Sequence, residues 1–137
     1  MDEQEFKNRT KNLALRVIKL AEALPNTRTA DVIGRQLLRC GTSVGANYRS
    51  ACRAKSTADI VAKLGIVEEE ADETLYRMEL LIEAGLIAPE RMTSVMKETN
   101  EILAMTVASI KTLRAKLKVN PKSQIANPKS NGRSKNE

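Results

Sequence analysis

Histidine and tryptophan are absent from this chain of 137 residues, and aromatic residues make up only 2% of it. Histidine is the side chain that enzymes use most often for proton transfer, and it is the commonest metal ligand. Its absence argues against a histidine-activated nucleophile and against a di-iron bundle site, which needs Glu-x-x-His motifs. We therefore expect no enzymatic activity, no cofactor and no metal. The shortage of aromatic residues also argues against a β-sheet protein.

Cysteines are few, and long apolar runs are missing. Cys40 and Cys52 would lie about 18 Å apart on one helix, too far for a disulfide. Free thiols are typical of the cytoplasm. No segment approaches the roughly 20 apolar residues that span a membrane, and the first residues are acidic and polar, unlike a signal peptide. We therefore expect a cytoplasmic protein without membrane contact.

The residues that are present favour helices. Hydrophobic residues make up 42% of the chain, enough for the core of one domain. Apolar residues recur at steps of three and four, which predicts helices over 3–24, 27–53, 57–84 and 89–117. Short connections make successive helices antiparallel neighbours, so we predict an all-α, up-down-up-down four-helix bundle over residues 1–118. A kink of the second helix around Gly41–Ser43 is the alternative to a straight one.

The net charge of +6 is unevenly distributed. Residues 119–137 contain four basic residues and one acidic residue, so they supply half of it. They are also rich in Asn, Pro and Ser and poor in large apolar residues. This composition predicts a flexible, disordered basic tail that adds salt-sensitive affinity for nucleic acid or only improves solubility.

The second predicted helix carries a stripe of arginines on one face. The stripe consists of Arg35, Arg39, Arg49 and Arg53. One interpretation is that they bind phosphate groups, extended by Lys55 and Lys63, because guanidinium binds phosphate through two hydrogen bonds. The other is that they pair with acidic residues of the third helix, within one chain or between subunits. The acidic residues on one side of that helix are Glu69, Asp72, Glu79 and Glu83.

A second face of the same helix carries Gly34, Gly41 and Gly45. Each glycine inside a helix costs about 1 kcal/mol relative to alanine, so these residues predict a neighbouring helix at unusually close range. Tyr48 falls on the apolar stripe, which favours packing, with a buried hydrogen bond to Asn47, over stacking on bases. We therefore assign these glycines, Tyr48, and Glu69 and Asp72 to helix packing or subunit contacts.

Four signatures along the chain carry a resemblance to a known family. They are Arg39-x-x-Thr42-Ser43-Val44-x-Ala46-Asn47-Tyr48, Ala54-Lys55-Ser56-x-x-Asp59, Lys63-Leu64 and Glu68-Glu69-x-Ala71-Asp72-Glu73-Thr74. With them, residues 3–117 closely resemble small bacterial four-helix-bundle proteins encoded by intervening sequences of large-subunit ribosomal RNA genes. The family includes the accessory variability determinant of diversity-generating retroelements. The resemblance implies a homopentamer that acts as an RNA or DNA accessory protein, with a reverse transcriptase as partner in the retroelement branch.

Two functions of different classes follow from these observations. The first is a non-enzymatic, oligomeric accessory protein that binds RNA or DNA through its basic helix face. The second is a protein-interaction scaffold whose charged stripes form subunit contacts, without any nucleic acid. The modest charge of residues 1–118 favours the ribosomal intervening-sequence branch over the strongly basic retroelement branch.

Overall fold

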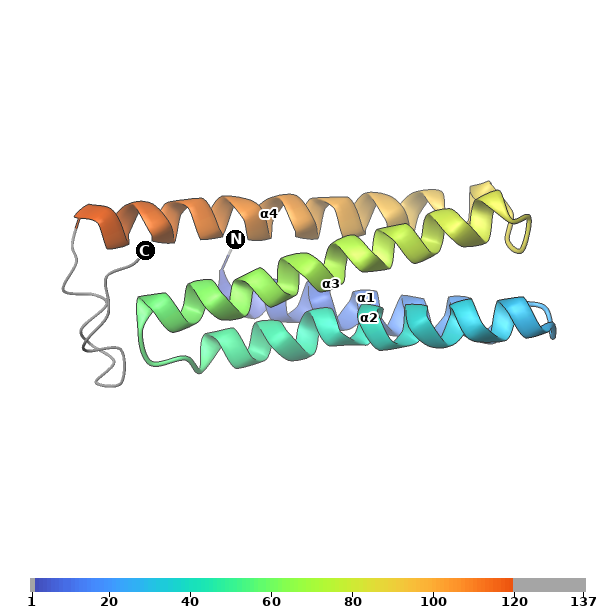
Figure 1. Ribbon diagram of the computed structural model, residues 1–137, viewed down its shortest axis with the longest axis horizontal. Helices are drawn as coiled ribbons and strands as arrows, with labels where there is room; N and C mark the ends of the chain where they lie inside the picture. Colours follow the sequence, from blue (N-terminus) through green and yellow to red (C-terminus); the bar gives the residue numbers. More distant parts are fainter. Residues whose placement is uncertain (1, 120–137) are drawn as a thin grey trace.

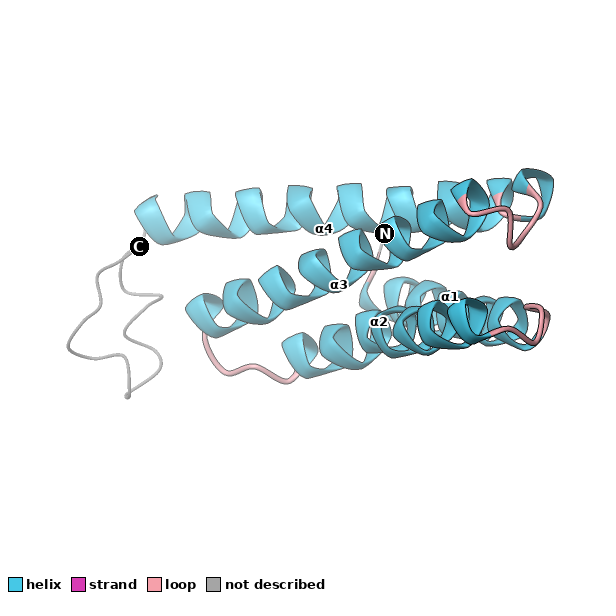
Figure 2. Cartoon of the chain, turned by 45° about the vertical axis from the view of Figure 1, so that its right-hand side comes forward, coloured by secondary structure: helices cyan, strands magenta, loops and turns pink. Residues whose placement is uncertain are grey.

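Four long helices run alongside one another in the computed structural model, which describes residues 2–119 (Figure 1). They are α1 (Glu3–Glu22), α2 (Arg28–Cys52), α3 (Thr57–Glu83) and α4 (Thr93–Val119), with a short 3-10 turn, η1 (Pro89–Arg91), ahead of α4. Short loops join successive helices at the two ends of the molecule (Figure 2). The predicted all-α, up-down-up-down bundle is confirmed, and residues 2–119 contain no strand.

Side chains at the helix ends explain where each helix begins. Asp2 and Glu5 form a capping box, in which Asp2 accepts a hydrogen bond from the Glu5 amide at 2.7 Å. Thr27 and Ser56 cap α2 and α3 by accepting from the amide three residues later, each at 3.1 Å. Beyond α3, Gly85 has a φ of +75°, a conformation that glycine adopts without steric cost.

One expected feature of the helices differs from the structure. The fourth helix begins at Thr93 and not at Pro89: Pro89–Arg91 form a separate 3-10 turn, and the Thr93 hydroxyl donates to the Pro89 carbonyl at 3.2 Å. At Gly41–Ser43, where a kink was the alternative to a straight helix, α2 continues as one α-helix from Arg28 to Cys52. Helix α4 extends to Val119, two residues past the expected end of the fourth helix and one past the expected end of the bundle. The rest of the predicted tail lies outside the described residues.

Aliphatic side chains fill the space between the helices. The largest fully buried ones are Leu13, Val17, Leu37, Val44, Val67, Met78, Leu81, Met92 and Ile102. Four buried threonines lie among them, and each hydroxyl donates to the carbonyl four residues earlier in its own helix. They are Thr10, Thr74, Thr99 and Thr106. These hydroxyls therefore enter the core without an unpaired polar group.

The glycine face of α2 packs against α1 of the same chain. Gly34, Gly41 and Gly45 are buried there. A Cβ atom added at Gly41 would lie 2.9 Å from both methyl carbons of Val17, closer than real Cβ contacts allow. A Cβ atom at Gly45 would lie 3.2 Å from the Thr10 hydroxyl. The glycines therefore set the short separation between α1 and α2.

Candidate nucleic-acid interface

The four arginines of the stripe all have exposed side chains. Arg35, Arg39 and Arg49 lie within α2, and Arg53 is the residue that ends it. Steps of three and four residues place them on one side of the helix, and Thr42 and Ala46 between them are exposed as well. The structure therefore gives one solvent-facing row, but its members differ in their contacts.

Arg39 is bound by carboxylates of α3. Its Nη1 lies 3.2 Å from Glu70 Oε1, and its Nη2 lies 2.6 Å from Glu73 Oε2. The hydrogen bond to Glu73 raises the pKa of Arg39, and the same bond holds the pKa of Glu73 below its ordinary value, with a further contribution from Arg77. Arg39 is thus a link between two helices of one chain.

The acidic partners differ from those that we expected. The expected set was Glu69, Asp72, Glu79 and Glu83. All four are exposed and form no ion pair within residues 2–119. The carboxylates that meet α2 instead come from Glu70 and Glu73, on the other flank of the α3 core stripe. The predicted pairing with α3 is therefore found at Arg39, but with carboxylates other than the expected ones, and the assignment of Glu69 and Asp72 to subunit contacts stays a prediction.

The remaining basic residues of the predicted site form few ion pairs or none. Arg35 forms only an exposed pair with Asp31, at 3.1 Å. Arg49, Arg53 and Lys55 form no ion pair with any described residue. Lys55 is exposed in the turn between α2 and α3, and Lys63 is half-buried in the second turn of α3. The unpaired positive charge therefore gathers toward the C-terminal end of α2.

A basic groove of about 440 Å³ lies between α1 and α2. Its lining residues are Gln4, Lys7, Asn8, Thr10, Lys11, Ala14, Thr42, Gly45, Ala46 and Arg49. Three of them are basic and none is acidic. Small residues form its floor, since Gly45 packs against Thr10 there. Lys7 is held by Glu3 at 3.0 Å, whereas Lys11 and Arg49 have no carboxylate partner within residues 2–119.

Lys7 and Lys11 were not among the residues predicted for the site. Both lie on α1, a helix for which the sequence predicted no site residue. A signal for them was present: they are four residues apart, so they share one helical face with Ala14. The glycines of α2 indicated a close neighbour, but the sequence did not say which face of which helix that neighbour presents.

Tyr48 lies outside this basic surface. Its ring meets Phe6 of α1 edge to face, with ring centroids 4.6 Å apart. Burial raises the pKa of Tyr48, and an interaction with Cys52 acts in the same direction. The expected hydrogen bond between Asn47 and Tyr48 does not form, because the Asn47 amide donates to the Ser43 carbonyl at 2.8 Å.

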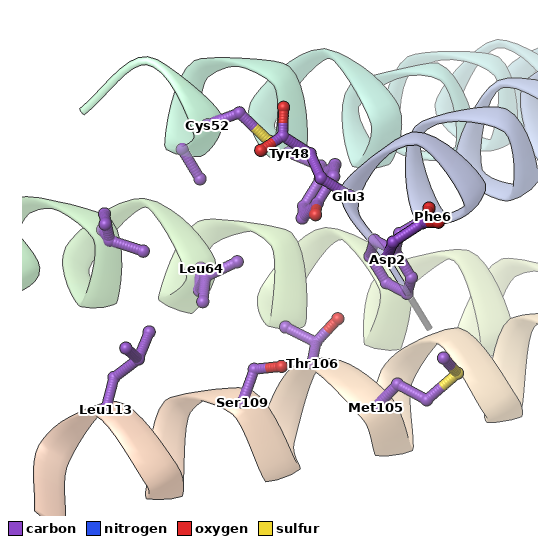
Figure 3. A pocket seen from close by; sticks show the side chains of 12 residues that line it. Asp2, Glu3, Phe6, Tyr48, Cys52, Leu64, Met105, Thr106, Ser109 and Leu113 are labelled. Atoms are coloured by element: carbon purple, nitrogen blue, oxygen red, sulfur yellow. The ribbon is translucent and has the colours of Figure 1, made fainter. Parts of the chain in front are cut away.

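Tyr48 and Cys52 face a second opening, of about 300 Å³, at one end of the bundle (Figure 3). Leu64 of α3 and Met105, Thr106 and Leu113 of α4 point into the same space. Apolar side chains predominate, and the charged residues that line it are the acidic Asp2 and Glu3. This chemistry suits phosphate poorly, so the basic groove is the better candidate interface.

Other kinds of site receive no support from the described residues. Within residues 2–119, no group of three or more acidic or cysteine side chains is arranged to hold a metal ion. Burial raises the pKa of the Cys40 thiol, which keeps it protonated and unreactive at neutral pH. None of the helices in this range has a stretch long and apolar enough to cross a bilayer.

Comparison with known proteins places this architecture in a family. A crystal structure from Bacteroides thetaiotaomicron, described as a protein of unknown function from the S23 ribosomal protein family, is 38% identical over 81% of this chain and 99% of its own, with a TM-score of 0.75. No curated protein matches the chain. Residues 2–108 match the family model described as 23S rRNA-intervening sequence protein. That range includes α1, α2, α3 and much of α4, and the chain therefore belongs to the 23S rRNA-intervening sequence protein family.

Proposed function

We propose that the protein is a non-enzymatic, oligomeric accessory protein that binds RNA or DNA phosphates along the groove between α1 and α2. One observation carries the proposal: the groove is lined by Lys7, Lys11 and Arg49 and by no carboxylate. Charge on a protein surface is usually balanced by neighbouring acids. A concave surface with only positive charge attracts an anion from solution, and the phosphate backbone is the anion that such surfaces bind most often.

The polar residues of the groove support this function. Gln4, Asn8 and Thr42 lie beside the basic side chains, and amide and hydroxyl groups are common donors to phosphate and sugar oxygens. Arg53 and Lys55 extend the positive surface beyond the end of α2. Arg39 has a different role in this proposal, because Glu70 and Glu73 already occupy its guanidinium. Contacts limited to phosphates give affinity without sequence preference.

The family supports the proposal from another direction. The intervening sequences that give these proteins their name are segments of 23S ribosomal RNA, so the family description itself refers to an RNA. The related crystal structure is described as one of unknown function, which leaves the role of the family open. The proposal therefore rests on the groove of this chain, and the choice between RNA and DNA falls to experiment.

The test is binding of a labelled structured RNA and a labelled DNA duplex, measured by fluorescence anisotropy at two salt concentrations. The decisive variant is Lys11→Gln/Arg49→Gln, which removes two unpaired charges from the groove. We expect weaker binding and a plot of log affinity against log salt that is shallower by about two, one for each lost phosphate contact. A truncated protein that ends at Lys118 is measured in parallel, to separate the contribution of the groove to binding from that of the tail.

A matched control removes equal charge elsewhere. Lys111→Gln/Arg114→Gln changes two exposed basic residues of α4 that have no ion pair within residues 2–119. This variant should bind nearly as well as the native protein. Equal loss in both variants would reduce the interaction to general charge attraction, and binding that disappears with the tail alone would remove the groove from the function.

A second candidate function is favoured by the exposed acidic side of α3. Glu69, Asp72 and Glu79 have no ion pair within residues 2–119 and carry the charge opposite to that of the groove. In a homopentamer, as the resemblance implies, the acidic side of one copy would meet the basic surface of the next, and the protein would act as a scaffold. Light scattering of Lys11→Gln/Arg49→Gln distinguishes the two functions. If the assembly of this variant stays intact, nucleic-acid binding is favoured; if it dissociates into subunits, the scaffold is favoured.

A further inference from the structure

Arg9 and Arg16 lie seven residues apart on the side of α1 that faces α4, so they occupy equivalent positions two turns apart. Arg9 is fully paired. Its Nε and Nη2 donate to the two carboxylate oxygens of Glu98 at 2.8 and 2.6 Å, and Nη2 also lies 2.9 Å from Glu101. At this level of the bundle, α4 supplies two negative charges to one arginine.

Arg16 has no such partner. Its Nη2 donates to the Ser94 hydroxyl at 2.8 Å, and no carboxylate of residues 2–119 pairs with it. The arginine instead borders a small cavity of about 190 Å³ between α1 and the start of α4. Its other lining residues are Lys19, Leu20, Arg91 and Val95. Three cationic side chains therefore border an open hollow that no acidic residue lines.

The fold brings these three charges together from segments that are far apart in the sequence. Lys19 follows Arg16 by one turn of α1, whereas Arg91 is the last residue of the turn η1, at the end of the bundle where α1 ends and α4 begins (Figure 1). The positive end of the α4 dipole lies at the same place, since α4 begins at Thr93. Three positive charges that border the same space repel one another, and an anion between them would relieve that repulsion.

We propose that Arg16, Lys19 and Arg91 bind a single phosphate group at this junction of α1 and α4. The oxygens of a phosphate group point to the corners of a tetrahedron. One arginine can donate to two of them through its planar guanidinium group, and the second arginine and the lysine can donate to the others. The small volume suits one phosphate, either inorganic phosphate or the terminal phosphate of a nucleic acid. The site is independent of the groove of the proposed function, because Lys7 and Lys11 line the α2 side of α1 and these residues line its α4 side.

The test is a titration of the full-length, ¹⁵N-labelled protein with sodium phosphate, with the ionic strength held constant by sodium chloride. We expect saturable shifts of the backbone amides around Arg16, Arg91 and Ser94. The variant Lys19→Gln/Arg91→Gln changes two exposed side chains and keeps the Arg16–Ser94 hydrogen bond, so the fold is retained. Phosphate should bind about tenfold more weakly to it, as expected for two lost partly exposed charge contacts.

The matched control is Lys97→Gln/Lys111→Gln, an equal change of charge at exposed positions of α4 outside the cavity. It should bind phosphate like the native protein. Shifts that do not saturate, that survive in Lys19→Gln/Arg91→Gln, or that weaken equally in the control would overturn the proposal.

Two further titrations identify the source of the phosphate. They use one short oligonucleotide with and without a 5′-terminal phosphate. Saturation by inorganic phosphate, or by the phosphorylated strand alone, supports the site and names its ligand. A response to both strands alike, with none to inorganic phosphate, contradicts a site for a single phosphate. Neither result depends on Lys11 and Arg49. The proposed function of the groove can therefore be refuted while the phosphate site is supported, and the phosphate site can be refuted while the groove is supported.

Discussion

Gly41 is the residue at which the distance between α1 and α2 is most sensitive to a single atom. The branched side chain of Val17 is fully buried, and its methyl carbons cannot retreat from a new Cβ atom 2.9 Å away. We expect Gly41→Ala to destabilise the protein, because overpacking costs about 1 to 3 kcal/mol and the helix propensity of alanine returns only about 0.5 to 1 kcal/mol. Urea unfolding followed by circular dichroism measures the difference.

The same substitution at Gly65 provides the control. Gly65 lies inside α3, and a Cβ atom added there would meet nothing within 4 Å. Only the helix propensity acts, so Gly65→Ala should stabilise the protein by about 0.5 to 1 kcal/mol. If the two variants changed stability in the same direction, close packing against Val17 would not be the reason for Gly41.

The sequence predicted some residues of the site and missed others. The cost of glycine in a helix predicted a close neighbour for Gly34, Gly41 and Gly45 without naming it. Lys11 was not predicted as a site residue, because the basic groove forms only where the faces of two helices meet. The pattern within one helix does not say which polar residues of another helix will border it.

At the scale of the elements, the Arg39–Glu73 contact ties α2 to α3 and makes their association depend on pH. The hydrogen bond from Arg39, followed by that from Arg77, lowers the pKa of Glu73 below its ordinary value of 4.5. A carboxyl with a lower pKa in the folded state contributes stability that is complete above the unfolded pKa. That contribution is lost as the pH falls through the folded pKa.

We therefore expect the variant Glu73→Gln to lose less stability than the native protein between pH 7 and about pH 3, because this acid-sensitive contribution is gone. Urea midpoints at a series of pH values measure it. Glu69→Gln is the matched control, since Glu69 is exposed and has no ion pair within residues 2–119; it should follow the native curve. Parallel curves for native protein and Glu73→Gln would refute a role for the contact in acid stability.

The elements themselves were the most predictable part of the molecule. Periodic apolar residues located the helices to within a few residues, and the structure shows Thr27 and Ser56 as the caps of α2 and α3. The acidic partners of Arg39 were not predictable in the same way. A core stripe has two flanks, and the handedness of the bundle decides which flank faces the preceding helix. Glu70 and Glu73 lie on that flank, and the sequence of α3 alone does not distinguish it from the flank with Glu69.

At the scale of the whole molecule, Arg9 connects the first long helix to the last. Its carboxylate partners Glu98 and Glu101 lie about 90 residues further along the chain, whereas most helix contacts join consecutive helices. The hydrogen bonds that Arg9 donates to Glu98 raise the pKa of Arg9, so the guanidinium stays charged in the folded protein. Because Arg9 and Glu98 are both half-buried, the pair is shielded from solvent more than a surface ion pair is.

We expect Arg9→Gln to cost about 1.5 to 3 kcal/mol, the range for hydrogen bonds to charged groups, because Glu98 and Glu101 lose the cation that pairs with both. Thermal or urea unfolding measures the loss. Arg35→Gln removes the exposed pair with Asp31 and should change stability by less than about 0.5 kcal/mol. Similar small effects for both variants would mean that the Arg9 contact contributes no more than a surface pair.

The contact between Phe6 and Tyr48 gives the molecule a built-in optical reporter. Tryptophan is absent and there are two tyrosines, of which Tyr76 is 53% exposed and Tyr48 is packed edge to face against Phe6. An asymmetric, fixed environment produces near-ultraviolet circular dichroism, so that signal comes mainly from Tyr48. The near-ultraviolet signal therefore reports on the junction of α1 with the C-terminal part of α2, whereas far-ultraviolet circular dichroism reports on all four helices. Fraying at that end of the bundle is therefore visible spectroscopically, without an added label, before the helices melt.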